Sequence, residues 1–325
     1  MVKKTDGWDL KRLLVEEIKK QGGWVNTHAH FDRAYTISPK LLNQAHALME
    51  RKWTLVDPMK RASSEEVYEA RIERAVRAMI SQGVSACATF IDVDPVAGLR
   101  AIKAALKVKK KYAGKITMLL INQVLKGVID EDSRRWAEKA LEYVDIIGGN
   151  PSKDRPQPRK HLDIVLGWAK KTGKMVHVHI DQENNPKEHD TELLARKTIE
   201  HGLEGKVVAV HSISVGAQPK KRRKEIYKLM KAAGLMVVCS PSAAISMKPL
   251  SYRTEIHNSI APVPELLDAG ITVGLGCDNI GDIFQPLVDG DMFTELRFLA
   301  EACRFYELDQ LVKIATINGK KVLGI

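Results

Sequence analysis

Short apolar runs alternate with longer amphipathic stretches along almost the whole of this 325-residue chain. The runs that we interpret as strands recur about every 30 residues, which is the length of a strand, a loop and a crossover helix in a βαβ unit. Near-continuous apolar character, as in residues 271–276, indicates strands buried on both faces. Together with an opening run at 25–32, the expected strands are 84–93, 116–122, 144–149, 175–181, 206–213, 235–240 and 271–277.

Eight such units can close as a (β/α)8 TIM barrel or spread as a doubly wound sheet. No run is followed by the GxGxxG motif of dinucleotide-binding folds. Polar residues instead collect where the strands end, and a TIM barrel builds its active site at that edge. We therefore expect an α/β chain folded as one TIM-barrel domain over residues 1–325. The polar residues at strand ends are His30, Asp92, Gln123, Asn150, His179, Asp181, His211, Ser240 and Asp278.

The formal net charge of +11 raises the question of a nucleic-acid partner. The basic residues gather in the runs 107–111 and 220–224, without the interleaved aromatic residues that stack on bases. Solvated helix faces are the simpler interpretation, and we expect no nucleic acid. No segment approaches the roughly 20 apolar residues that span a bilayer, and no apolar stretch at the start marks a secretory signal. Four widely spaced cysteines indicate free thiols and a cytoplasmic location.

A pair of histidines, His28 and His30, closes the opening run. Side chains two apart on a strand share one face, so two imidazoles can bind one transition metal if other strands add ligands. Alone the pair is a weak signal. His179, His211 and Asp278 end later runs, and this order of ligand types is far more specific than any one member.

The ligand order resembles that of the amidohydrolase superfamily, and the chain is similar to its cytosine deaminase branch along nearly its whole length. The matching segments are 28–32, 89–93, 122–123, 145–151, 177–181 and 276–279. The resemblance implies one divalent ion, zinc or iron, because the bridging lysine that a second metal needs is replaced by Gly148-Gly149-Asn150. Its ligands would be His28, His30, His179 and Asp278.

The same resemblance implies roles for further residues. His211 would polarise the substrate or shuttle a proton, and Gln123 would hydrogen-bond a ring carbonyl. Asn279 and Phe284 would line the pocket. Asp181 belongs to the polar mouth of the barrel, where it either orients a ligand imidazole beside the substrate or is a structural carboxylate.

The implied chemistry is attack by a metal-activated hydroxide on a ring carbon. A divalent ion lowers the pKa of its water from about 15.7 to about 7, and Asp278 can accept the proton. Deaminases of this branch return it through the glutamate of a His-x-Asp-Glu motif, but this chain has Gln182 there. An amide transfers no proton, and losing a general acid typically costs about 10²–10⁴-fold in rate. Gln182 can still donate a hydrogen bond to a substrate oxygen.

Three functions remain open from the sequence. The leading one is hydrolysis of a C–N bond in a small N-heterocycle such as a cyclic amidine, as in cytosine deamination. Cyclic amide hydrolysis with Asp278 as sole proton shuttle, or a metal-binding pseudoenzyme, is the alternative. The branch usually carries a small β-sandwich around the barrel, and His28 lies too near the start to leave room for it. A barrel-only variant or a trimmed chain is expected, and a homo-oligomer is possible.

The remaining histidines need separate interpretations. His177 is expected to pack in the barrel interior below His179. His257 belongs to a long segment after the seventh strand that is expected to form part of the pocket wall. Those expected in exposed helices or loops are His46, His161, His189 and His201.

Overall fold

The computed structural model describes residues 9–183, 185–246 and 260–325 of the chain. Its strands pair in parallel, in a sheet of order β1-β2-β3 and a sheet of order β4-β5-β6-β7-β8. All eight expected strands are found within a few residues of their predicted positions. They are β1 (Trp24–Asn26), β2 (Val84–Asp92), β3 (Thr117–Gln123), β4 (Ile147–Gly149), β5 (Val176–Ile180), β6 (Val207–His211), β7 (Met236–Cys239) and β8 (Val273–Leu275).

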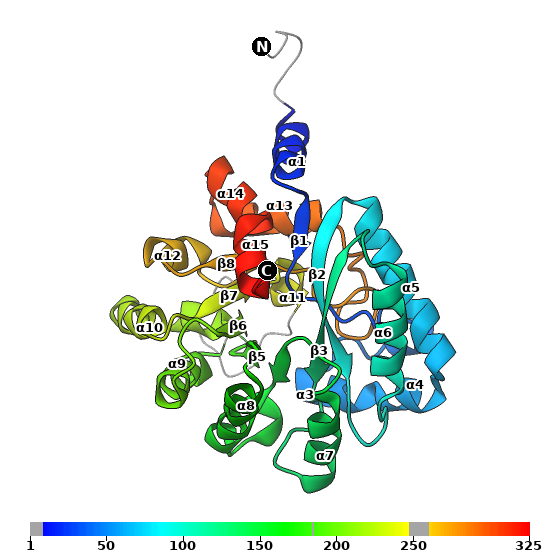
Figure 1. The fold of residues 1–325 in the computed structure, drawn as a ribbon. Helices are drawn as coiled ribbons and strands as arrows, with labels where there is room; N and C mark the ends of the chain where they lie inside the picture. Colours follow the sequence, from blue (N-terminus) through cyan, green and yellow to red (C-terminus); the bar gives the residue numbers. More distant parts are fainter. Residues whose placement is uncertain (1–8, 184, 247–259) are drawn as a thin grey trace.

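Two seams separate the sheets, and backbone contacts cross both of them. Ile121 forms an isolated parallel bridge with Ile146, which links β3 to β4. Ala29 forms another with Asp278, just beyond β1 and β8. The strands therefore come round into the barrel arrangement that Figure 1 shows, with helices around the outside.

The outer helices pack apolar faces onto the strands. In α5, for example, the buried residues Tyr68, Ile72, Ala75, Val76 and Met79 recur at helical spacing along one face. The helices of the ring are α5 (Glu65–Ser81), α6 (Arg100–Lys111), α7 (Glu131–Ala140), α8 (Pro158–Thr172), α9 (Asp190–His201), α10 (Lys220–Ala232), α12 (Val263–Asp268), α13 (Met292–Cys303) and α14 (Leu308–Ala315). Also described are α1 (Leu10–Lys20), α11 (Pro241–Ser246) and the 3₁₀ turns Pro151–Asp154 and Ile213–Ala217.

The two basic runs lie on the outer helices α6 and α10, as expected. Lys107 pairs with Glu65 at 2.7 Å and Lys111 pairs with Glu73 at 2.8 Å, so part of the positive charge of α6 is balanced by α5. Within the described ranges, no helix is both long enough and apolar enough to cross a bilayer.

The last helix, α15 (Ile317–Leu323), lies across the near end of the barrel in Figure 1. The Val322 carbonyl lies 3.0 Å from Nε2 of His177, which is fully buried, as expected for a core histidine. Gly319 allows the close approach, because a Cβ there would lie 2.7 Å from the Cβ of Val25. This end of the barrel is thereby filled, and the site must lie at the other end.

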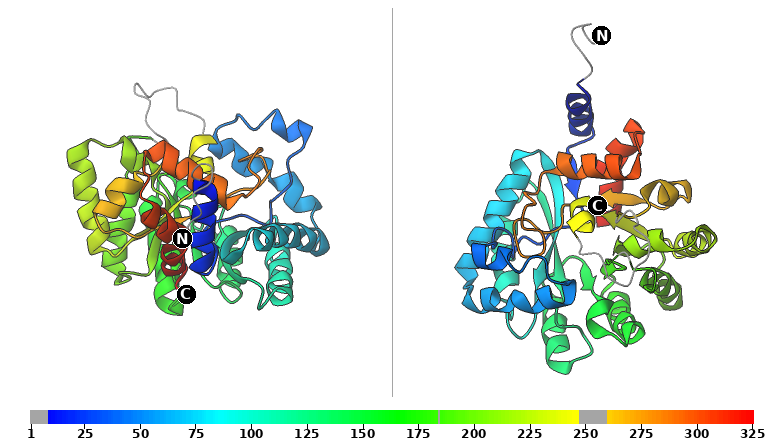
Figure 2. Two further views of the ribbon diagram at one scale, coloured as in Figure 1. Left: turned by 90° about the horizontal axis from the view of Figure 1, so that it is seen from above. Right: turned by 180° about the vertical axis from the view of Figure 1, so that it is seen from behind.

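Three short helices, α2 (Pro39–Leu42), α3 (Met49–Leu55) and α4 (Asp57–Ala62), follow β1. The chain leading into them is held against the loop after β8, since the Tyr35 amide donates to the Ile280 carbonyl at 2.8 Å and the Ile37 amide donates to Gly281 at 2.9 Å. Figure 2 shows the blue helices and the orange loop side by side in its right-hand view. Together they cover one side of the carboxyl ends of the strands.

Candidate metal centre

Four histidines and one aspartate converge at the carboxyl ends of the strands. His179 lies in β5 and His211 ends β6. His28 and His30 lie just beyond β1, which ends at Asn26, so the expectation that the strand itself runs through them is wrong. They are held in place instead by the bridge of Ala29 to the β8 side. All five predicted residues are buried.

Asp278 lies at the middle of this cluster. Its Oδ1 is 3.2 Å from Nε2 of His30 and 3.4 Å from Nε2 of His28, and its Oδ2 is 3.6 Å from Nε2 of His211. The ring of His179 has its centroid 4.9 Å from that of His28 and 5.5 Å from that of His211. Ligand atoms therefore lie within 4.8 Å of one another in two overlapping groups, His28 with His179 and His211, and His28 with His30 and Asp278.

Burial controls the charge state of the cluster. It lowers the pKa of His30 and His179 well below the usual value, and that of His211 to about 4. Burial alone would raise the pKa of Asp278, but the neighbouring His28 and His30 outweigh it and bring this pKa well below its ordinary value. At neutral pH the imidazoles of His30, His179 and His211 are thus neutral and Asp278 is a carboxylate, the protonation states that metal ligation requires.

The residues fit a divalent ion. Both ring nitrogens of His28, the Nδ1 atoms of His30 and His179, and Oδ1 of Asp278 are buried without a hydrogen-bond partner. Unsatisfied buried polar atoms are costly, and two of these, Nε2 of His28 and Oδ1 of Asp278, lie 3.4 Å apart, which indicates a missing shared partner. Imidazole and carboxylate donors suit zinc or iron. In the described part of the chain, no lysine lies at the end of β4, in keeping with a single ion.

Phe90 of β2 forms the floor of the cluster, a role that the sequence did not suggest. Its ring centroid lies 4.5 Å from that of His179, 5.0 Å from that of His28 and 5.4 Å from that of His30. The Phe90 amide donates to the Ala29 carbonyl at 2.8 Å, which places the ring beneath the His-x-His pair. Close packing of an aromatic ring against three imidazoles restricts the orientations that the imidazoles can take.

A cavity of about 30 Å³ opens beside the cluster. Gln123, at the end of β3, lines it with a buried Oε1 that has no partner. Gln182, Asn279 and Phe284 line it as well, as predicted. Asn150, one of the polar residues expected at strand ends, also lines it, and the structure adds Arg33, Met49, Trp53 and Leu125.

Asp181 lies differently from the other predicted residues. Its carboxylate accepts hydrogen bonds from the backbone amides of Asp190 and Thr191, both at 2.9 Å, at the start of α9. A carboxylate at a helix N-terminus is stabilising. These two hydrogen bonds hold the connection between β5 and α9. A direct role of Asp181 at the substrate stays a prediction.

Arg33 and Lys60 belong to a buried charge network behind the cavity. Arg33 lies 3.1 Å from Asp92, and its guanidinium lies over the Phe284 ring at 5.0 Å. Lys60 is fully buried and lies 2.6 Å from Asp94 and 3.1 Å from Asp92. Asp92, one of the polar residues expected at strand ends, therefore serves this network, and its described ion pairs are with Arg33 and Lys60 and not with an imidazole.

One prediction about the remaining histidines is wrong. His161 was expected to be exposed but is fully buried, with Nδ1 at 2.6 Å from Asp154 and Nε2 accepting from the Asn150 amide at 2.9 Å. It anchors the loop after β4, which sequence spacing alone does not reveal. His46 and His189 are exposed, as expected, and His201 is half-buried. His257 lies outside the described residues.

Several of these residues hold unusual backbone conformations. His211, Asp278 and Asp181 have φ of 81°, 60° and 47°, in the left-handed region that side chains other than glycine rarely adopt. Each follows or ends a strand at the cavity edge. Such strain concentrates at functional sites, where the surrounding structure holds the side chain in one direction.

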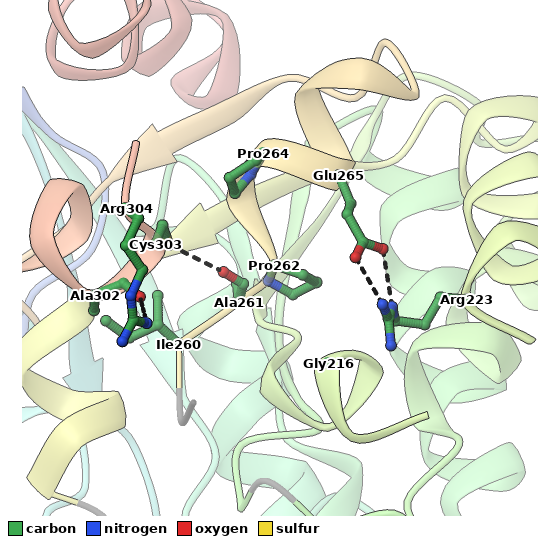
Figure 3. Close-up of a pocket in the computed structure, with 10 residues that line it drawn as sticks. All are labelled: Gly216, Arg223, Ile260, Ala261, Pro262, Pro264, Glu265, Ala302, Cys303 and Arg304. Atoms are coloured by element: carbon green, nitrogen blue, oxygen red, sulfur yellow. Dashed lines mark hydrogen bonds and ion pairs between the residues drawn. The ribbon is translucent and has the colours of Figure 1, made fainter. Parts of the chain in front are cut away.

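A separate hollow lies between α10, α12 and α13, away from the histidines (Figure 3). It measures about 290 Å³, and its polar lining is dominated by Arg223 and Glu265. These two side chains form a double contact at 2.7 and 2.9 Å and so neutralise each other. We therefore assign no reaction to this hollow.

Comparison with known proteins agrees with the geometry. The model of the amidohydrolase family matches residues 22–325. The N-isopropylammelide isopropyl amidohydrolase of Pseudomonas sp. (strain ADP) is 27% identical over 317 residues, which cover 93% of this chain and 74% of that protein. An uncharacterized protein of Haemophilus influenzae is 44% identical over 261 residues, which cover 79% of this chain and 95% of the other.

Among solved structures, 5-methylcytosine deaminase from Klebsiella pneumoniae, liganded with 5-fluorocytosine, superposes with a TM-score of 0.87 at 23% identity. The match covers 93% of this chain and 74% of that one, and it confirms the TIM-barrel fold. Proteins of the matched family use a divalent metal, for which the histidine and aspartate cluster offers a site. The chain therefore belongs to the amidohydrolase family, whose deaminases and amidohydrolases act on carbon–nitrogen bonds.

Proposed function

We propose that this protein hydrolyses an exocyclic C–N bond of a small N-heterocycle and releases ammonia or an amine. The observation that carries the proposal is the buried cluster of His28, His30, His179 and Asp278 beside a cavity lined by amide side chains. Relatives that act on N-isopropylammelide and on 5-methylcytosine support the substrate class. The four cysteines are all free, which fits a reducing cytoplasm as the place of action.

The four ligand residues would hold one zinc or ferrous ion, which when bound supplies an activated water for the attack. Gln123 would hydrogen-bond the ring, since it lines the cavity; its buried Oε1 has no donor and would accept from a ring N–H. Phe284 and Trp53 line the same cavity with aromatic surface. A planar ring would be held between these faces.

Proton transfer falls to Asp278 and His211, because Gln182 has no exchangeable carboxyl proton. The Oδ2 atom of Asp278 is 3.6 Å from Nε2 of His211, so a proton taken up by Asp278 can be passed on without a large movement. Gln182 is buried, and its Nε2 has no hydrogen-bond partner. It is therefore placed as a donor to a substrate oxygen.

The test is release of ammonia or amine from a panel of aminopyrimidines, amino-oxotriazines and their N-alkyl derivatives. The protein is loaded with zinc or ferrous iron, and the metal content of each sample is measured. His28→Ala serves as the blank, and His46→Ala, which removes an exposed imidazole, serves as the matched control. Release by wild type and by the His46 variant, but not by the His28 variant, is the expected result.

Two outcomes would count against the proposal. A ring-opened product without ammonia would favour the cyclic amide alternative, in which Asp278 alone carries the proton and Gln182 needs none. Full metal loading, tight binding of a ring and no product of either kind would favour a binding protein without turnover.

A further inference from the structure

A second cavity, of about 20 Å³, adjoins the one beside the histidine cluster. The two share lining residues, among them Gln182, His211 and Asp278. Each is about the size of one water molecule, so a bound ring must occupy the space of both and displace a side chain between them. Met49 and Phe284 also line both cavities and are the apolar side chains at this boundary.

Lys52 of α3 is the cation of this second cavity. Its residue is only 6% exposed, and its ammonium group makes one hydrogen bond, to the Phe284 carbonyl at 3.4 Å. Among the described residues, no carboxylate lies within 4 Å of it. Burial lowers the pKa of Lys52, and the nearby Asp282 carboxylate, which raises it, offsets that effect only in part.

Arg33, which also lines the pocket, differs from Lys52 because it has carboxylate partners. Arg33 lies 3.1 Å from Asp92 and 3.8 Å from Asp282, so its charge is already balanced. The Asp282 carboxylate also accepts from Asn279, at 2.5 Å, and from the Phe284 amide, at 2.8 Å. Lys52 is thus the pocket cation whose charge is left for a ligand.

Two amide side chains of the second cavity, Gln285 and Gln182, also have N–H groups without partners. The side chain of Gln285 accepts from the Asn279 amide at 2.5 Å, which leaves its Nε2 buried and unpaired. Nε2 of Gln182 is unpaired as well. Buried donors that lack acceptors are costly, and an ammonium group with two amide N–H groups matches a negatively charged oxygen.

Resting on the proposed function, we propose that Lys52 anchors a negatively charged oxygen of the substrate, so that the pocket selects anionic over neutral N-heterocycles. The charge is either that of an ionised oxo group on the ring or that of a carboxylate attached to it. The shared chemistry is an anionic oxygen that replaces the missing carboxylate partner of Lys52. The hydrogen bond of Lys52 goes to the Phe284 carbonyl and not to a metal ligand, so Lys52 acts on binding and orientation and takes no part in bond cleavage.

Binding of rings that are not turned over tests this without relying on catalysis. In the first pair, barbiturate is an ionised ring at neutral pH and uracil is a neutral one. In the second pair, orotate carries a carboxylate on the ring and 6-methyluracil carries an uncharged methyl group. Dissociation constants are measured by calorimetry at pH 7 on the zinc-loaded protein and on the chelator-treated protein. Variants are Lys52→Met, Lys52→Arg and the matched control Arg51→Met, which removes a positive charge from the exposed neighbour on the same helix.

We expect wild type to bind the anion of at least one pair about tenfold or more tightly than its neutral partner, the effect of one charge-assisted hydrogen bond. Lys52→Met should abolish that ratio, while Lys52→Arg and Arg51→Met should keep it. A preference within the barbiturate pair alone identifies an ionised ring, and one within the orotate pair alone identifies a ring carboxylate.

The proposal is overturned if wild type shows no preference in either pair, or if Lys52→Met weakens anions and neutral rings equally, as a purely structural lysine would. If Lys52→Met does not fold, the absence of a preference in wild type still overturns the proposal, and loss of a wild-type preference is sought with Lys52→Gln in the chelator-treated protein. An anion preference that depends on Lys52 in a protein that releases no ammonia would leave this inference standing and contradict only the proposed reaction.

Discussion

His30 and Asp278 come from opposite ends of the chain, yet Nε2 of His30 lies 3.2 Å from Oδ1 of Asp278. The bridge between Ala29 and Asp278 produces this contact by joining the chain after β1 to the chain after β8. The candidate metal centre therefore lies at a seam of the barrel. Its geometry depends on the closure of the fold and not on one loop.

The first prediction concerns Asp278→Asn. The amide keeps the shape of the side chain but removes both the negative charge and the proton acceptor. Metal content should fall, and the rate with any substrate found should drop by about 10²–10⁴-fold. Elemental analysis together with steady-state kinetics checks both effects. Asp289→Asn, in the exposed part of the same loop, is the control and should behave like wild type.

The second prediction concerns the amide at position 182. Gln182→Glu restores a group that transfers protons, so ammonia release from cytosine should rise by about tenfold or more over wild type. The neighbouring Asn279→Asp change, which also introduces a carboxylate at the cavity, should give no such gain. Initial rates of ammonia release at pH 7 measure this. Equal rates for Gln182→Glu and wild type would show that another group already delivers the proton.

The third prediction concerns the aromatic floor of the cluster. Phe90→Leu should weaken zinc binding, because the smaller side chain leaves the imidazoles of His28 and His179 free to turn. Phe298→Leu is the control: it makes the same substitution at a half-buried position on α13, away from the site, and should bind zinc like wild type. Competition with a chromogenic chelator measures the affinities. Unchanged zinc affinity in both variants would limit Phe90 to a packing role.

Much of this site follows from local sequence patterns. Strand runs repeat with the βαβ spacing, and polar residues that end parallel strands must meet at one edge of the barrel. That is why His179, His211 and Asp278 could be placed together with the His-x-His pair before any coordinates. The resemblance to a known family then supplied their roles.

Long-range contacts account for what the sequence did not reveal. Phe90 reaches the histidines only because the register of β2 puts its amide on the Ala29 carbonyl. Lys52 lies on a short helix whose own pattern is unremarkable, and it becomes part of the pocket through its contact with Phe284. His161 is buried by Asp154 and the Asn150 amide, which belong to a loop without a periodic signal.

The fourth prediction concerns Lys60, whose ammonium group is fully buried between Asp92 and Asp94. Lys60→Met leaves Asp94 without its cation and Asp92 with Arg33 alone, and it should lower the free energy of unfolding by about 3–5 kcal/mol. Lys107→Met, which removes a half-exposed lysine paired with Glu65, should cost about 1 kcal/mol or less. Urea unfolding followed by circular dichroism measures both, and similar losses would contradict the assignment of the buried network.

The fifth prediction uses the pH dependence of stability at Glu295. Burial raises the pKa of this carboxyl from 4.5 to about 8, although the Ser242 amide donates to it at 3.0 Å. Between these pH values the folded state keeps a proton that the unfolded state has lost, so its contribution to the free energy of unfolding falls as pH rises. The loss is complete above the folded pKa.

Glu295→Gln does not ionise and keeps an acceptor for the Ser242 amide. Other buried carboxyls titrate in both proteins, so the difference between variant and wild type isolates Glu295. Between pH 4.5 and about 8, the free energy of unfolding of Glu295→Gln minus that of wild type should increase by up to about 1.4 kcal/mol for each pH unit. Urea unfolding at several values between pH 5 and pH 9 measures it. A difference that stays constant with pH would show that Glu295 ionises as readily in the folded chain as in the unfolded one.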